Sequence, residues 1–302
     1  MKILVLGGCG FIGSHLVDGL LAAGHKVRVF DRAPELYRQL LTNVDYRFGD
    51  FSDVPSLAEA LEGIEVVYHL ISTTVPSTSN LDPVADVQGN LLNTLRLLQL
   101  MVGKNIHKIV FLSSGGTVYG IPDTVPIPET HPLRPICSYG VVKVAVENYL
   151  QMFHQLHGLE YVVLRASNPY GERQGHAGVQ GVIGTFMQKM LAGEQIEIWG
   201  DGSVIRDFIY VGDLARLCVL AGQSEVTGTY NAGQGVGYSI NEAVGMLSKV
   251  AGQAIEPTYR AGRGFDVPSV VLDISQACQA FEWQPSSNLE CGLAATWRWM
   301  KP

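Results

Sequence analysis

The stretch that most limits how this chain can fold is its start, "KILVLGGCGFIGSHL". An apolar run over residues 2–7 predicts a buried strand, and apolar residues recur at helical spacing from Phe11 onward. Between them lies "GGCGFIG", whose four glycines remove side chains where the backbone must turn tightly. A strand that passes through such a turn directly into a helix is typical of a parallel α/β sheet.

The rest of the first half repeats this alternation of strands and helices. Further strand-like runs cover residues 26–30, 44–48, 65–70, 108–114 and 161–167, and helix-like segments cover 11–23, 53–62, 84–103 and 139–157. The pattern predicts the α/β class with a doubly wound parallel sheet. From position 168 onward, glycine-rich loops separate shorter elements. We therefore expect one domain over 1–167, completed by 206–238, and a smaller α/β domain over most of 168–302.

The charge and composition of the chain limit which ligands it can bind and in which compartment we expect it. A net charge of −7 argues against a nucleic-acid-binding surface, which needs clustered Lys and Arg. The start lacks the pattern of a signal peptide, and the longest apolar stretches are too short to predict a membrane span. The five cysteines are widely spaced without a CxxC pair, and the eight histidines show no metal-ligand spacing. We expect a cytoplasmic protein without a metal site.

The glycine-rich turn fits a dinucleotide-binding site. Its glycines match G-x-G-x-x-G at Gly8, Gly10 and Gly13, and also G-x-x-G-x-x-G at Gly7, Gly10 and Gly13. Such a turn lets a pyrophosphate approach the backbone and the amino terminus of the following helix.

Two acidic residues that follow later strands indicate which dinucleotide binds. Asp31 ends the second strand, where a carboxylate accepts hydrogen bonds from the adenosine ribose and repels the 2′-phosphate of NADP. NAD is therefore favoured, although the neighbouring Arg32 would suit that phosphate. Asp50 follows the third strand and is placed to contact the adenine amino group.

A candidate proton-transfer pair lies in "SYGVVK", where Tyr139 and Lys143 share one face of a predicted helix. A tyrosine with a pKa near ~10 is a poor base at neutral pH. We expect the Lys143 ammonium and a positive nicotinamide ring to lower the pKa of Tyr139. Lys143 can also donate to the nicotinamide ribose.

With these residues, the chain resembles the extended short-chain dehydrogenase/reductases, in particular the nucleotide-sugar epimerases. The resemblance spans the whole chain and is carried by "GGCGFIGSH", "VFDR", "GNLLNTLRLL", "SSGGTVYG", "SYGVVK", "LRASNPYG", "GDGSVIRDFIYVGDLA" and "FDVPSVVLD". It implies a Rossmann domain that binds NAD and a smaller domain that binds a UDP-sugar. It also implies 4-epimerisation through a transient 4-keto sugar, with Tyr139 as the base and acid. The sugar would be glucose and galactose or their N-acetyl forms.

The resemblance assigns further residues to each ligand. On the cofactor side these are Phe11, Ile12, Phe51, Leu70, Asn90 and Ser113. Arg206, Arg263 and Asn168 match the positions that contact the diphosphate or sugar. Val270 aligns with a position that limits room beside the sugar C2 substituent, where valine would admit an N-acetyl group. In the family, the helix that corresponds to 91–100 and the helix that carries Tyr139 pair with those of a second subunit across a two-fold axis. The resemblance therefore implies a homodimer.

One position departs from the family pattern. The family commonly carries Ser or Thr where "SSGGTVYG" has Gly115, and that hydroxyl bonds the reacting sugar hydroxyl. Thr117 is the first candidate to replace it, because residues 115 and 117 of an extended strand point to one side. Ser114 is the second.

The same stretch bears on which reaction the chain catalyses. It lacks the carboxyl group that a dehydratase of the family uses there to protonate the leaving hydroxyl. This absence argues against dehydration and, less strongly, against decarboxylation. A UDP-glucuronate decarboxylase or 4-epimerase and a non-catalytic NAD-binding paralogue remain as alternatives.

Overall fold

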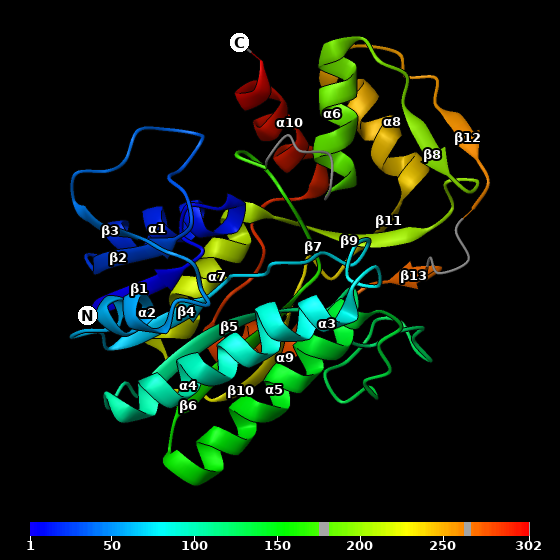
Figure 1. Cartoon of the computed structure of the whole chain (residues 1–302). Helices are drawn as coiled ribbons and strands as arrows, with labels where there is room; N and C mark the ends of the chain where they lie inside the picture. Colours follow the sequence, from blue (N-terminus) through cyan, green and yellow to red (C-terminus); the bar gives the residue numbers. More distant parts are fainter. Residues whose placement is uncertain (175–180, 263–266, 302) are drawn as a thin grey trace.

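A computed structural model describes residues 1–174, 181–262 and 267–301. Its centre is a seven-stranded, wholly parallel sheet (Figure 1). In sheet order the strands are β10 (Gly228–Ala232), β6 (Glu160–Ala166), β5 (Lys108–Ser114), β4 (Val66–His69), β1 (Lys2–Leu6), β2 (Lys26–Asp31) and β3 (Val44–Phe48). The order reverses between β1 and β4, and ligands of such sheets bind at the carboxyl ends beside this reversal.

Helices cover both faces of this sheet, which explains why its central strands are continuous apolar runs. One face packs against α1 (Phe11–Ala22), α7 (Val211–Gln223) and α9 (Ser275–Phe281). The other face packs against α2 (Val54–Ala60), α4 (Asn93–Gly103) and α5 (Ser138–His157). Figure 1 shows α4 and α5 lying side by side on that second face.

The helical segment before β5 is interrupted. It consists of α3 (Pro83–Asp86), a π-helical turn η1 (Val87–Leu92) and then α4. The Asp82 side chain caps the start by accepting from the Ala85 N–H at 2.9 Å. Single π turns inside α-helices often mark functional sites. Here the turn directs the buried side chains of Asp86 and Asn90 toward the loop after β4.

A second, smaller sheet lies beyond the carboxyl ends of the large one. Its strands are β11 (Gly237–Ser239), β9 (Ile205–Tyr210), β13 (Ser269–Val270) and β7 (Asn168–Tyr170), and a separate pair joins β8 (Glu197–Trp199) to β12 (Thr258–Arg260). Three helices share an apolar core with this region: α6 (Val182–Ala192), α8 (Ile240–Ala251) and α10 (Leu289–Met300).

The predicted doubly wound α/β fold is confirmed, and the predicted strands and helices of the first half are present within one or two residues of their expected bounds, except that the predicted helix over 84–103 is divided into α3, η1 and α4. After β9 the chain returns to the large sheet, because α7 packs on α1 and β10 pairs with β6. The division into domains at residue 167 stays a prediction. All five cysteines lie in the described part of the chain and are free thiols. No helix among the described residues is long and apolar enough to cross a bilayer.

Candidate active site

The glycine-rich turn between β1 and α1 is packed too closely to admit side chains. Gly7 has a φ of +83°, and a Cβ there would lie 3.3 Å from the backbone of Leu70. A Cβ on Gly13 would lie only 2.1 Å from the Gly7 carbonyl oxygen. These glycines therefore set how closely α1 approaches the sheet, as a dinucleotide site requires.

The amino terminus of α1 suits a phosphate. Gly10 is the N-cap, and among the described residues no side chain caps the helix. The first turn, which includes Phe11 and Ile12, has no acidic residue. The N–H groups of that turn and the positive end of the helix dipole are thus directed at the position expected for a pyrophosphate. The residues present fit NAD.

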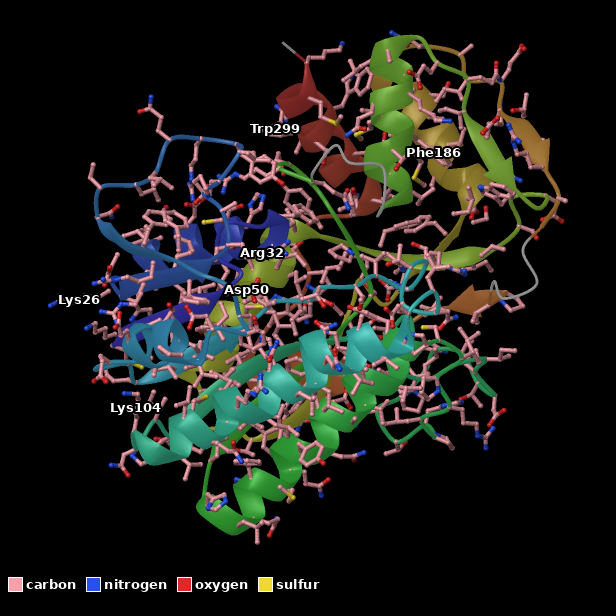
Figure 2. All side chains as sticks on the ribbon, viewed as in Figure 1. Lys26, Arg32, Asp50, Lys104, Phe186 and Trp299 are labelled. Carbon is pink, nitrogen blue, oxygen red and sulfur yellow. The ribbon has the colours of Figure 1, made fainter. Side chains whose placement is uncertain are left out.

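Asp31 connects the end of β2 to the glycine turn. Its carboxylate accepts from the N–H of Cys9 at 2.9 Å and from that of Arg32 at 2.8 Å. Figure 2 shows Arg32 and Asp50 close together at this edge of the sheet. The pKa of Asp50 is lowered mainly by hydrogen bonds from Ser52, and the charge of Arg32 adds to this. The carboxylates predicted to face the adenosine thus lie at the carboxyl ends of neighbouring strands.

Three other residues predicted to contact the cofactor form part of the protein framework of the site. Phe51 is buried with its ring centroid 5.1 Å from that of His69. The Asn90 amide accepts from the Thr73 N–H at 2.8 Å and thereby holds the loop after β4. The Ser113 hydroxyl donates to the buried Glu147. Whether these side chains also touch the cofactor stays a prediction.

Tyr139 and Lys143 lie together on the amino-terminal half of α5. The Lys143 ammonium donates to the carbonyl of Leu112 on β5 at 2.9 Å and lies 5.4 Å from the centroid of the Tyr139 ring. It also lies 4.6 Å from the centroid of the Phe111 ring. Burial lowers the pKa of Lys143 to about 8, while the charges of Glu147 and Asp86 act in the opposite direction.

The expected lowering of the Tyr139 pKa is not found in the protein alone. Burial raises the pKa of Tyr139, the charges of Cys137 and Asp86 raise it further, and a hydrogen bond with Ser72 lowers it. The expectation counted the attraction of Lys143 but omitted the cost of ionising a phenol in a desolvated position. A positive nicotinamide ring would act against this cost.

Sequence reasoning missed Asp86, the most enclosed charged side chain near the pair. It is fully buried at the end of α3, and its carboxylate accepts from Thr74 Oγ1 at 2.6 Å, Asn90 Nδ2 at 2.8 Å and Ser138 Oγ at 2.7 Å. Asp86, His69, Tyr139 and Lys143 line one cavity of about 10 Å³. The acceptor role of Asp86 depends on contacts across about fifty positions of sequence, which no local motif reveals.

The segment 115–117 is a turn and not an extended strand, so the reason given for choosing Thr117 was wrong. β5 ends at Ser114, whose carbonyl accepts from the N–H groups of Thr117 and Val118. Within the described residues, the buried Thr117 Oγ1 has no hydrogen-bond partner. The turn lies against α5, because a Cβ on Gly140 would come within 2.7 Å of the Thr117 carbonyl oxygen.

Gly115 is enclosed by the core. A Cβ at this position would lie 2.6 Å from Leu272 Cδ1 and 3.0 Å from the Arg165 carbonyl oxygen. Leu272 itself is fully buried, so the space where the family's Ser or Thr side chain would begin is filled by a residue from near the carboxyl terminus.

Two predicted substrate residues line a cleft of about 440 Å³ beside the smaller sheet. They are Asn168 and Arg206, and the other lining includes Phe186, Lys189 and Trp199. The Asn168 amide donates to the Asp207 carbonyl at 3.0 Å, and Arg206 donates to the Val267 carbonyl at 2.7 Å. Clefts of this size hold nucleotide-sized ligands.

The other two predicted substrate residues are placed differently. Val270 is 2% exposed and belongs to an apolar cluster with Val118 and Leu272, so it is packed and does not line an open space. Arg263 lies outside the described residues.

Residues 3–233 match the model of the NAD dependent epimerase/dehydratase family. The chain belongs to this family. A putative UDP-glucose 4-epimerase from Methanocaldococcus jannaschii is 37% identical over 307 residues, which cover 99% of this chain and 98% of that protein. The predicted family is therefore confirmed, and NAD is the cofactor.

Solved structures of the family superimpose on the whole chain. The UDP-glucose 4-epimerase of Thermotoga maritima, solved with UDP-glucose, has a TM-score of 0.95 at 36% identity and covers 99% of this chain and 98% of its own. That of Thermus thermophilus, solved with NAD, has a TM-score of 0.92 at 34% identity, again with 99% and 98% covered. The Rossmann-like fold is thus the fold of this family.

Proposed function

We propose that this protein is an NAD-dependent nucleotide-sugar 4-epimerase that acts on UDP-glucose and UDP-galactose or on their N-acetyl forms. The observation that carries the proposal is the Tyr139–Lys143 pair on α5, in which Lys143 is buried and Tyr139 is half-buried, at the carboxyl end of the sheet whose first strand leads into the glycine turn. The relatives named UDP-glucose 4-epimerases, which match the chain end to end, support this choice of reaction.

In this reaction Tyr139 and Lys143 have different roles. Tyr139 takes the proton of the sugar 4-hydroxyl at its phenolic oxygen and later returns it. Lys143, fixed by the Leu112 carbonyl, places a positive charge 5.4 Å from the centroid of the Tyr139 ring, where it would favour the phenolate. NAD, when bound, accepts a hydride from the sugar carbon and gives it back. The buried residues Val142 and Val146 limit the access of water to Lys143.

We assign the auxiliary hydroxyl to Thr117, with Ser114 as the second candidate. An unpartnered buried hydroxyl costs on the order of 1–3 kcal/mol, and a sugar hydroxyl would relieve that cost. The packing of the 115–117 turn on Gly140 brings Thr117 next to the first turn of α5, from which Tyr139 projects.

The UDP group is assigned to the cleft beside the smaller sheet. β5 and β6 pair up to Ser114 and Ala166, and Asn168 follows two residues later, so the cleft begins beside the 115–117 turn. Arg206 supplies a guanidinium for the diphosphate, and Arg263 is predicted to supply another. Val270 is packed against Val118 and Leu272, so the prediction that it admits an N-acetyl group requires these side chains to make room.

Proton NMR of the anomeric region tests the reaction with UDP-glucose and UDP-N-acetylglucosamine in parallel, with catalytic NAD. Appearance of the galacto isomer from either sugar supports 4-epimerisation, and conversion of the second shows that an N-acetyl group fits. The same spectra with UDP-glucuronate, together with trapped CO₂, test the uronic-acid alternative. Bound NAD without turnover of any of the three would favour the non-catalytic paralogue.

We further propose a cytoplasmic homodimer. Apolar side chains are exposed along two neighbouring helical segments: Val84, Val87 and Leu92 on one, and Val141, Met152 and Leu156 on α5. Leu156 is 66% exposed, and charge there would oppose burial between two copies. Leu156→Glu should therefore convert a dimer to a monomer in light scattering, and a wild-type protein that is already monomeric would refute the proposal. The five free thiols suit a reducing compartment.

A further inference from the structure

The negative charges of two buried carboxylates, Glu147 and Asp86, act on Lys143, and the two differ in whether they form an ion pair. Glu147 has its own cation, because Arg165 Nη2 lies 2.6 Å from Glu147 Oε2 and both side chains are buried. Asp86 forms no ion pair with any of the described residues, and its three hydrogen-bond donors are uncharged groups. A buried carboxylate without a cation is costly, so such a residue needs a compensating role.

The surroundings of Asp86 show where its charge acts. It lines the same small cavity as Tyr139 and Lys143, and Lys143 is the cationic side chain in that lining. The other ionisable groups that face the pair are Cys137, which is the N-cap of α5, Glu147 in the middle of α5, and His69 from β4. Burial lowers the pKa of His69 to about 3, so this ring is neutral and adds no positive charge.

Asp86 also fixes the position of the reacting residue. Its Oδ2 accepts from the hydroxyl of Ser138, the residue directly before Tyr139, while its Oδ1 accepts from Thr74 and Asn90. One carboxylate thus joins the π-interrupted helix, the loop after β4 and the first turn of α5.

We infer that Asp86 is a positioning residue of the catalytic pair: its charge acts on Lys143 across the cavity that both line, and its hydrogen bonds hold the first turn of α5. The inference rests on the proposed roles of Tyr139 and Lys143. Removing the negative charge should make Tyr139 ionise at lower pH, because a like charge nearby opposes formation of the phenolate.

The substitution that isolates the charge is Asp86→Asn. Oδ1 would still accept from Thr74 and Asn90, and the new amide N–H would donate to the Ser138 hydroxyl, which can accept as well as donate. The matched control is Ser138→Ala, which removes one hydrogen bond of Asp86 and leaves its charge.

The measurement is an ultraviolet tyrosinate titration of the NAD complex without any sugar, with Tyr139→Phe subtracted to isolate one of the twelve tyrosines. Asp86→Asn should move the Tyr139 ionisation down by roughly one pH unit or more, and Ser138→Ala should leave it in place. An unmoved titration in Asp86→Asn, or an equal shift in both variants, would overturn the inference. Because no sugar is present, this outcome is independent of whether the epimerase proposal is right.

A second readout covers the case in which Asp86→Asn alone does not fold. If the two charges compensate each other, removing both is less harmful than removing one. The Asp86→Asn/Lys143→Met double variant should then unfold at a higher temperature than either single variant. Additive losses in the two singles and the double would show that Asp86 and Lys143 are not coupled.

Discussion

The large sheet and the smaller one both form the site, but they hold their residues by different means. The large sheet uses parallel strands of four to seven residues whose central members are buried on both faces, and Lys143 is fixed against β5. The smaller sheet uses strands of two to six residues around an open cleft, where Asn168 and Arg206 each donate to a backbone carbonyl. The proton-transfer residues thus lie on the large, buried sheet, and the residues predicted to bind the nucleotide sugar lie on the smaller sheet with its open cleft.

The largest expected effect lies on the large sheet. Tyr139→Phe removes the oxygen that carries the proton and should lower kcat by roughly 10²- to 10⁴-fold. The change keeps the ring, so NAD affinity by calorimetry should stay within about threefold of wild type. A variant with near-normal turnover would show that another group moves the proton.

Gly13→Ala tests how tightly the cofactor side is built. The new Cβ would lie 2.1 Å from the Gly7 carbonyl oxygen, and a backbone neighbour can move aside only if α1 moves off the sheet. We expect a loss of about 3 kcal/mol or more in unfolding free energy and loss of NAD binding. Thermal denaturation and calorimetry measure both.

The matched control for that change is Gly245→Ala on the exposed face of α8, where a Cβ meets no atom of the described chain within 4 Å. Gly245→Ala should raise the free energy of unfolding by about 0.5–1 kcal/mol, because alanine is favoured over glycine in a helix interior. Equal effects at the two positions would contradict the contrast drawn between the packed turn and the open helix.

On the smaller sheet the expected effect is on ligand affinity. Arg206→Gln should raise KM for the UDP-sugar by roughly 10- to 100-fold, because a charge-assisted hydrogen bond to phosphate is lost. NAD affinity should not change. Lys189→Gln is the control: its ammonium lies in the same cleft but donates to the Gln195 carbonyl. Equal increases in KM for both variants would indicate a general charge effect.

A further prediction concerns the contact between the two layers. Gly115→Ser should cost about 1–3 kcal/mol in unfolding free energy, since its Cβ meets Leu272 and the Arg165 carbonyl. Gly116→Ser should cost less, because the nearest atom to its Cβ is 4.0 Å away. Denaturant titration of the two variants compares them, and similar values would mean that Leu272 yields easily.

The sequence was most informative where function depends on local spacing. The glycine turn, Asp31 and the Tyr139–Lys143 pair were all found from short segments, because a helix face or a strand end can be read from nearby residues. Asp86 was missed, since its partners come from three separate segments. The enclosure of Gly115 was also hidden, because Leu272 approaches it from a distant part of the chain. The residues assigned by resemblance alone stay predictions.

The contact between Gly115 and Leu272 has a consequence for synthesis. A nascent chain that has emerged through Ala232 already contains all seven strands of the large sheet, and with them the glycine turn and the Tyr139–Lys143 pair. Leu272, which backs the 115–117 turn, is still inside or near the ribosome at that moment. Domains generally fold as they are made. The strands of the NAD-binding sheet are therefore made first, while α9, which covers part of one face of that sheet, and Leu272, which supports the sugar site, follow later.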